Sequence, residues 1–195
     1  VLHGHERRGG DRRHGPGRIV GVDEVEFLGL PDGVLEYGLT LRRAIAGAIR
    51  RHRPDVVITG NYRETFPGGM LNQADHVATG RAVVDAVRDA GNRWVFREQV
   101  ESDGIEPWGG VRQVWVAASP DARHGVDVSA TFDAGVASLR APAGYVGGLG
   151  WEDFDPAAFL ASMSAPTGER MGVEHAVAFE LLRMHRDDCP TPSRR

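Results

Sequence analysis

An adjacent carboxylate and imidazole, Asp75 and His76, form the pair of side chains with the clearest chemical potential in the chain. Histidine is a natural zinc ligand, and a neighbouring carboxylate can orient the imidazole or balance the charge of a metal site. The pair follows a polar, glycine-rich loop from Gly60 to Gln73, and connections of this length are usually functional or disordered. A second interpretation needs no metal, because Asp75 would also favour a helix N-terminus and His76 would then be a polar first-turn residue.

Two helices and a strand are expected to position this loop. Apolar residues recur at helical spacing over residues 39–52, and Pro54 ends that helix. The β-branched run Val56–Ile58 is typical of a strand buried on both faces, as in a parallel sheet. A second helix is predicted from about Ala74 to Ala90. This order of elements predicts an α/β layered domain, in which ligands bind beyond the carboxyl ends of the strands.

Further elements are expected on both sides of this core. A short apolar strand is predicted before it, and strands, helices and a loop after it. They are a strand at Val25–Leu28, strands at Val114–Ala117 and His124–Val128, a helix capped by Ser129 and running through Tyr145, a loop at Trp151–Pro156, and helices at Ala157–Met163 and Val173–His185.

The composition narrows the classes of function. With 195 residues the chain is long enough for one domain with a sizeable core, and no run approaches the ~20 apolar residues of a membrane span. The net charge of -4, and arginine clusters without interleaved aromatic residues, give no reason to expect a nucleic-acid partner. The single cysteine, Cys189, excludes an internal disulfide and fits the reducing cytoplasm. The start of the sequence has no apolar run, so a secretory signal is not expected there.

The first residues differ sharply from the rest, because they are Gly, Arg and His with almost no apolar content. Such a segment is expected to be disordered, although His3, His5 and His14 leave a metal-binding tract as an alternative. The expected organisation is a disordered or aberrant segment over 1–18, one domain over 19–186 and a flexible tail over 187–195.

Three short segments carry recognisable patterns: VEFLGLPDG at residues 25–33, IRRHRPDVVIT at 49–59 and ADHVATGRA at 74–82. They resemble, in order, the FLG-x-x-DG segment, the IR-x-x-x-PDVV-x-T strand entry and the PDH-x-A-x-GRA metal motif of the PIG-L/LmbE-like deacetylase family. The resemblance covers about residues 19–150.

This resemblance implies a Rossmann-like fold with a mostly parallel sheet and one catalytic zinc ion. Such enzymes remove an acetyl group from an N-acetylated amino sugar or a related amide, so a small-molecule substrate is expected. His76 matches a zinc ligand of the family, and Asp75 matches the acidic neighbour, which we assign to catalysis. Gln73 stands where many members have a histidine that stabilises the tetrahedral intermediate; an amide can donate a hydrogen bond but cannot transfer a proton. Asn61 and Arg63, with Gln73, are expected to bind substrate.

The family's first metal motif, His-Pro-Asp-Asp, is absent from the sequence, and its strand would lie before Ile19. The expected fold is therefore incomplete at its N-terminus, through either a truncated or frame-shifted gene model or a real loss of half of the site. An inactive remnant or a sugar-binding module is the alternative to an enzyme. A nucleotide-binding protein is less favoured, because the glycine-rich residues 144–150 follow a helical pattern rather than a strand.

Overall fold

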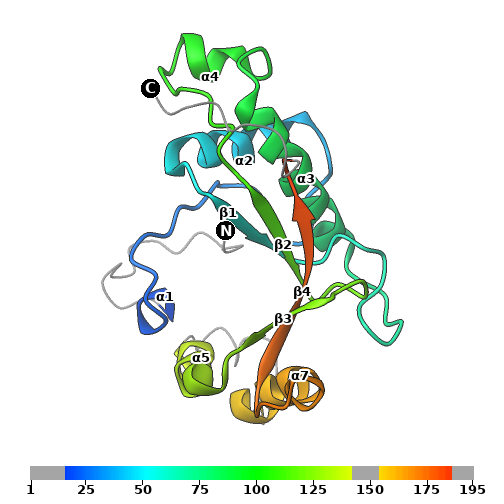
Figure 1. Cartoon of the computed structure of the whole chain (residues 1–195). Helices are drawn as coiled ribbons and strands as arrows, with labels where there is room; N and C mark the ends of the chain where they lie inside the picture. Colours follow the sequence, from blue (N-terminus) through cyan, green and yellow to red (C-terminus); the bar gives the residue numbers. More distant parts are fainter. Residues whose placement is uncertain (1–15, 142–153, 186–195) are drawn as a thin grey trace. The chain divides into compact units, whose positions relative to one another are not determined.

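The computed structural model describes residues 16–141 and 154–185 (Figure 1). The chain divides into two compact units, each built from two stretches of sequence. The first unit comprises Val1–Pro31 and Gly125–Ala178, and the second comprises Asp32–His124 and Phe179–Arg195. In the described ranges no helix is long and apolar enough to cross a membrane. The domain boundaries inferred from the sequence stay a prediction.

The second unit contains the two helices and the strands expected to flank the candidate loop. Its elements are α2 (Leu39–His52), β1 (Val56–Thr59), α3 (Ala74–Gly91), α4 (Arg97–Glu101), β2 (Gln113–Ala117) and most of β4 (Ala176–Arg183). β1 pairs in parallel with β2, with Ile58 opposite Trp115, and β2 pairs antiparallel with β4. The predicted helices over 39–52 and 74–90 are confirmed.

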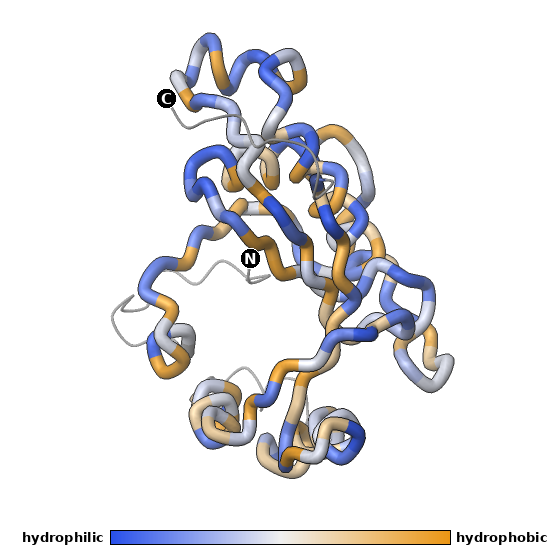
Figure 2. The backbone as a smooth tube through the Cα atoms, in the orientation of Figure 1, coloured by the Kyte–Doolittle hydropathy of each residue, from blue (hydrophilic) through white to orange (hydrophobic). Residues whose placement is uncertain are grey.

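The α/β class is confirmed, while the sheet differs in detail from the expected one. Among the described residues the strand order is β1-β2-β4-β3, with β1–β2 parallel and β2–β4 antiparallel, so the expected mostly parallel sheet is not observed. β1 therefore lies at the edge of the described sheet rather than at its centre. Val56 is 41% exposed and Ile58 is 65% exposed, so the prediction that this strand is buried on both faces is wrong. Figure 2 shows how hydrophobic β1 nevertheless is along its length.

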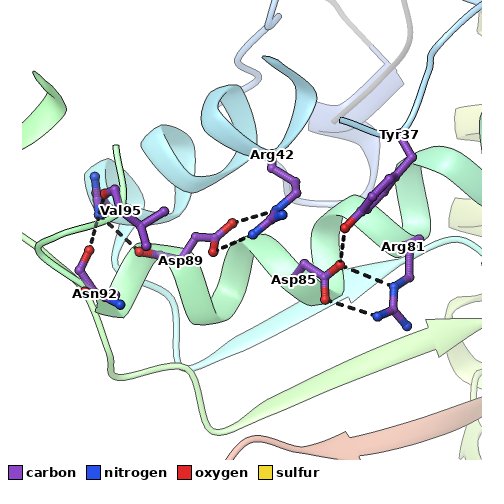
Figure 3. A network of polar contacts seen from close by, with 8 residues as sticks. Tyr37, Arg42, Arg81, Asp85, Asp89, Asn92 and Val95 are labelled. Carbon is purple, nitrogen blue, oxygen red and sulfur yellow. Dashed lines mark hydrogen bonds and ion pairs between the residues drawn. The ribbon is translucent and has the colours of Figure 1, made fainter. Parts of the chain in front are cut away.

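Helices α2 and α3 pack against each other through apolar side chains and one ion pair. Arg42 of α2 donates two hydrogen bonds, of 2.9 and 2.8 Å, to the carboxylate of Asp89 on α3 (Figure 3). Hydrogen bonding to Asp89 raises the pKa of Arg42 above its ordinary value despite some desolvation. The apolar residues buried on the two helices are Leu41, Ile45, Ala46, Ile49, Ala82, Val83, Ala86, Val87 and Ala90.

The first unit is mainly helical. It contains α1 (Pro16–Ile19), η2 (Ser129–Thr131), α5 (Phe132–Arg140), α7 (Pro156–Met171) and nearly all of β3 (His124–Asp127). The Asp155 carboxylate caps α7 by accepting a 2.9 Å hydrogen bond from the Ala157 amide, and Gly172, with φ 72°, ends it. This helix is longer than the predicted Ala157–Met163.

Two predicted elements are wrong. Residues 25–28 form no strand, and the predicted helix at Val173–His185 is the strand β4 instead. Apolar residues in β4 fit both helical and strand spacing, and the pairing with β2 decides between them. Of the predicted disordered segment, residues 16–18 begin α1, and the rest lies outside the described residues, as do Tyr145 and the tail over 187–195.

Candidate functional site

The loop between β1 and α3 is held by two buried asparagines. The Asn61 side chain donates to the Thr65 carbonyl at 2.8 Å and accepts from the Arg63 amide at 2.9 Å. The Asn72 side chain donates to the Asn61 and Arg63 carbonyls at 2.8 and 3.0 Å. Both asparagines are less than a tenth exposed. The predicted substrate-binding residue Asn61 thus has its amide engaged within the loop.

The same loop contains a short hairpin. Thr65 and Leu71 form an antiparallel bridge, and the Phe66 amide donates to the Met70 carbonyl at 2.8 Å. Gly68 and Gly69, with φ 85° and 83°, make the turn that a side chain would strain. The loop therefore has a defined, hydrogen-bonded conformation.

Helix α3 starts at the carboxyl end of β1. A Cβ atom on Gly80 would lie 2.8 Å from the Gly60 carbonyl oxygen and 2.9 Å from the Tyr62 Cβ, so only glycine allows this approach. Gly60 directly follows Thr59, the last residue of β1. The first turns of α3, with Asp75 and His76, are thereby positioned at this edge of the sheet.

The first turn of α3 carries Asp75 and His76 side by side. Asp75 is 5% exposed, yet within the described residues its side chain has no hydrogen bond or ion pair. His76, beside it in the first turn, is half-buried. Gln73 is exposed at the N-cap position and its side chain makes no capping hydrogen bond. Among the described residues, Thr79 Oγ1 is the buried side-chain polar atom without a partner, so the Asp75 carboxylate oxygens keep contact with solvent.

Arg63 belongs to a network that is centred on Glu180 of β4. Arg63 donates to the Glu180 carboxylate at 2.6 and 3.3 Å and also pairs with Asp121 at 3.0 Å. The Tyr62 and Ser119 hydroxyls donate to the same carboxylate at 3.1 and 2.6 Å. The network links the loop to β4 and to the segment after β2.

Burial, hydrogen bonds and neighbouring charges in this network shift the pKa values of Glu180, Arg63 and Tyr62. Burial disfavours the Glu180 carboxylate, but the hydrogen bonds from Arg63 and Ser119 outweigh burial, and its pKa is lowered. Hydrogen bonding to Glu180 raises the pKa of Arg63. Burial, assisted by the Glu180 charge, raises the pKa of Tyr62. Glu180 is therefore an anion and Arg63 a cation at neutral pH. Glu180 is not among the predicted site residues, because interpreting residues 173–185 as a helix hides the alternation that turns Glu180 inward.

A complete metal site is not present in the part of the chain that the structure describes. It contains no group of three His, Cys, Asp or Glu side chains that could hold a metal ion. Asp75 and His76 alone do not supply the ligand set of a catalytic zinc.

Over residues 5–87 the chain matches the family model described as PIG-L, GlcNAc-PI de-N-acetylase. No curated protein gives a significant match.

Two solved structures are similar over most of the chain. One is the N,N'-diacetylchitobiose deacetylase from Pyrococcus horikoshii complexed with its inhibitor MPG, with 20% identity and a TM-score of 0.74. The other is the conserved protein TT1542 from Thermus thermophilus, with 28% identity and a TM-score of 0.64. The matches cover 86% and 84% of this chain but only 60% and 68% of those proteins. The chain thus spans about three fifths to two thirds of these relatives.

Proposed function

We propose that this chain is part of a zinc-dependent N-deacetylase that hydrolyses the acetamide of an N-acetylated amino sugar or a related small molecule. The PIG-L match over residues 5–87 and the fold of the deacetylase neighbour support the proposal. In it, His76 is one ligand of a single zinc ion and Asp75 is the acidic group beside it. The cytoplasm stays the expected compartment on cysteine usage alone.

The observation that carries this proposal is the state of Asp75. The residue is 5% exposed and lies in the first turn of α3, directly beside His76. The positive end of α3 favours a carboxylate at this position, and a cation bound at His76 would favour it further.

The remaining residues of the loop have distinct proposed roles. Gln73 is exposed beside Asp75 and His76, so its amide is placed to donate a hydrogen bond to a substrate oxygen. Arg63 is proposed to contact substrate from within its ion pairs, and Asn61 to support it by fixing the loop. Zinc, when bound, polarises an amide carbonyl and lowers the pKa of a bound water.

A second candidate function is a non-catalytic sugar-binding module or inactive remnant of the same fold. It is favoured by the absence, among the described residues, of any group of three side chains that could hold a metal ion. Such a module would keep the ordered loop and bind sugar without hydrolysing it.

Zinc stoichiometry separates these two functions. We expect the chain to retain little zinc after dialysis, and a version extended upstream by a strand ending in His-Pro-Asp-Asp to retain one ion per molecule and release acetate from an N-acetylglucosaminide. His76→Ala should then remove most of the zinc, because a catalytic site needs about three protein ligands. Zinc retention that is indifferent to His76→Ala would refute the proposed site, and an extended chain without zinc or acetate release would favour the binding module.

A further inference from the structure

The tip of the hairpin between β1 and α3 is an exposed, uncharged surface. Residues 65–71, which we call the hairpin tip, read Thr-Phe-Pro-Gly-Gly-Met-Leu, in a chain of which 26% is charged. Met70 is 67% exposed and Leu71 is 76% exposed. Neighbouring exposed apolar side chains of this kind mark interaction sites more often than isolated ones do.

The exposure of these side chains is built into the fold. The bridge between Thr65 and Leu71, and the hydrogen bond from the Phe66 amide to the Met70 carbonyl, close the hairpin. At the base of the hairpin, the backbone N–H of Asn72 donates to the Glu64 carbonyl at 2.8 Å. A preorganised surface of this kind loses little conformational entropy when it binds.

The cation of the same loop is already neutralised. The Arg63 side chain is 39% exposed, but it lies 2.6 Å from the Glu180 carboxylate and 3.0 Å from that of Asp121. One cation between two anions leaves this cluster with a net negative charge. A phosphate brought to it would meet repulsion rather than a free guanidinium.

We propose that this loop selects the group attached to the amino sugar: the hairpin tip binds an uncharged, apolar aglycone, and the Arg63 cluster disfavours a phosphate. The inference rests on the proposed function and deepens it by naming a substrate class. An aglycone is the favoured occupant because only Asn72 and Gln73 separate the tip from the helix that carries Asp75 and His76, the residues proposed to act on the sugar.

The test is a binding titration of the full chain with three probes, with NMR or calorimetry as the readout. The probes are methyl N-acetyl-β-glucosaminide, its phenyl analogue, and N-acetylglucosamine 1-phosphate. We expect the phenyl probe to bind about tenfold more tightly than the methyl probe, the gain expected from burying part of one ring. The phosphate probe should bind most weakly.

Variants assign these preferences to the loop. Leu71→Ser and Met70→Ser should each reduce the preference for phenyl, whereas Leu39→Ser, at another apolar position that is 63% exposed, should not. Asp121→Asn should strengthen phosphate binding by about threefold, the effect of one exposed ion pair. Asp103→Asn is the matched exposed control.

Several results would overturn the inference. If the phenyl and methyl probes bind equally, or if the phenyl preference survives both serine variants, the hairpin tip does not bind the aglycone. Either result would leave sugar recognition by the chain unaffected. Tightest binding of the phosphate probe would also contradict it. Failure to bind any of the three would reject both this inference and sugar recognition by the chain.

Discussion

Two arginines of the second unit, Arg50 and Arg63, are held by opposite means. Arg50 of α2 is 2% exposed, and its acceptors are uncharged oxygens at the C-terminal end of α3, in the turn that follows and on α4. Desolvation lowers its pKa, with no carboxylate bonded to it. Arg63, in the loop before the other end of α3, is 39% exposed and bonded to carboxylates. The acceptors of Arg50 are the carbonyls of Asp89, Ala90, Asn92, Val95 and Phe96 and the side chain of Gln99.

The difference separates a cation enclosed by neutral acceptors from one that is paired with carboxylates and keeps exposed surface. The donors of Arg50 are saturated by carbonyl dipoles and have no access to solvent, so this guanidinium joins α2, α3 and α4 and does nothing else. Arg63 keeps exposed surface in a loop whose backbone is rigid. Stability is therefore expected to depend mainly on the C-terminal end of α3, and ligand recognition on its N-terminal end.

The largest effect should come from Arg50→Met. The variant leaves several buried carbonyls without donors, and each unsatisfied group costs about 1–3 kcal/mol, so we expect a loss of roughly 3 kcal/mol or more in the free energy of unfolding. Urea denaturation followed by circular dichroism measures it. Arg88→Met, at an exposed position on α3, is the control and should change little. Equal stability of the two variants would show that the carbonyl cage contributes nothing.

A smaller and pH-dependent effect is expected from Glu180→Gln. Removing the anion leaves Arg63 in a partly buried site with one partner fewer, at a cost of about 2 kcal/mol near neutral pH. Because the pKa of Glu180 is lowered from 4.5 in the folded chain, its stabilisation is present above that value and is lost as the pH falls through the native pKa. The difference between the variant and the parent should therefore shrink below pH 4.5. Urea midpoints over a pH series would reveal it, and a constant difference would contradict the ion-pair account.

The smallest effect should come from Gly80→Ala. Its added methyl group meets the Gly60 carbonyl oxygen at 2.8 Å, which is backbone and cannot swing away, so a loss of about 1–2 kcal/mol is expected. Gly135→Ala on α5 is the comparison, because the nearest atom to its added methyl group, Leu160 Cδ1, lies at an ordinary contact distance of 3.7 Å. Thermal unfolding compares the two. If Gly135→Ala proves the more damaging, the close approach of α3 to β1 is not a determinant of the fold.

Local patterns were sufficient to predict the helices around the candidate site. The helical period over 39–52, and the stop signals at Pro54 and Gly91, are properties of short segments. The strand Val56–Thr59 was predicted as well, but its place at the sheet edge depends on distant pairing. The same holds for Ala176–Arg183, whose strand pairing with β2 joins residues far apart in sequence.

The candidate site divides in the same way. Asp75 and His76 were visible because their helix start and the preceding loop are local features. Glu180, which holds Arg63, was not visible, because a carboxylate on a misassigned element gives no signal of its partner. Ser119, whose hydroxyl donates to Glu180, was missed with it. Nor could spacing show that the Asn61 amide is engaged by its own loop.

The central claim, that the N-terminal end of α3 is the metal-binding end of this molecule, is tested most directly by following histidine ring signals by NMR as zinc is added to the chain. Binding will be weak with so few ligands, but the His76 ring should shift at lower zinc concentration than His124, His175 and His185. Among these, His175 bonds through Nδ1 to Ser164 at 2.9 Å and stacks on Phe132, so it is already engaged. His76→Ala should abolish the earliest shifts. If His124, His175 or His185 responds first and His76→Ala leaves the titration unchanged, the metal-binding end has been placed wrongly.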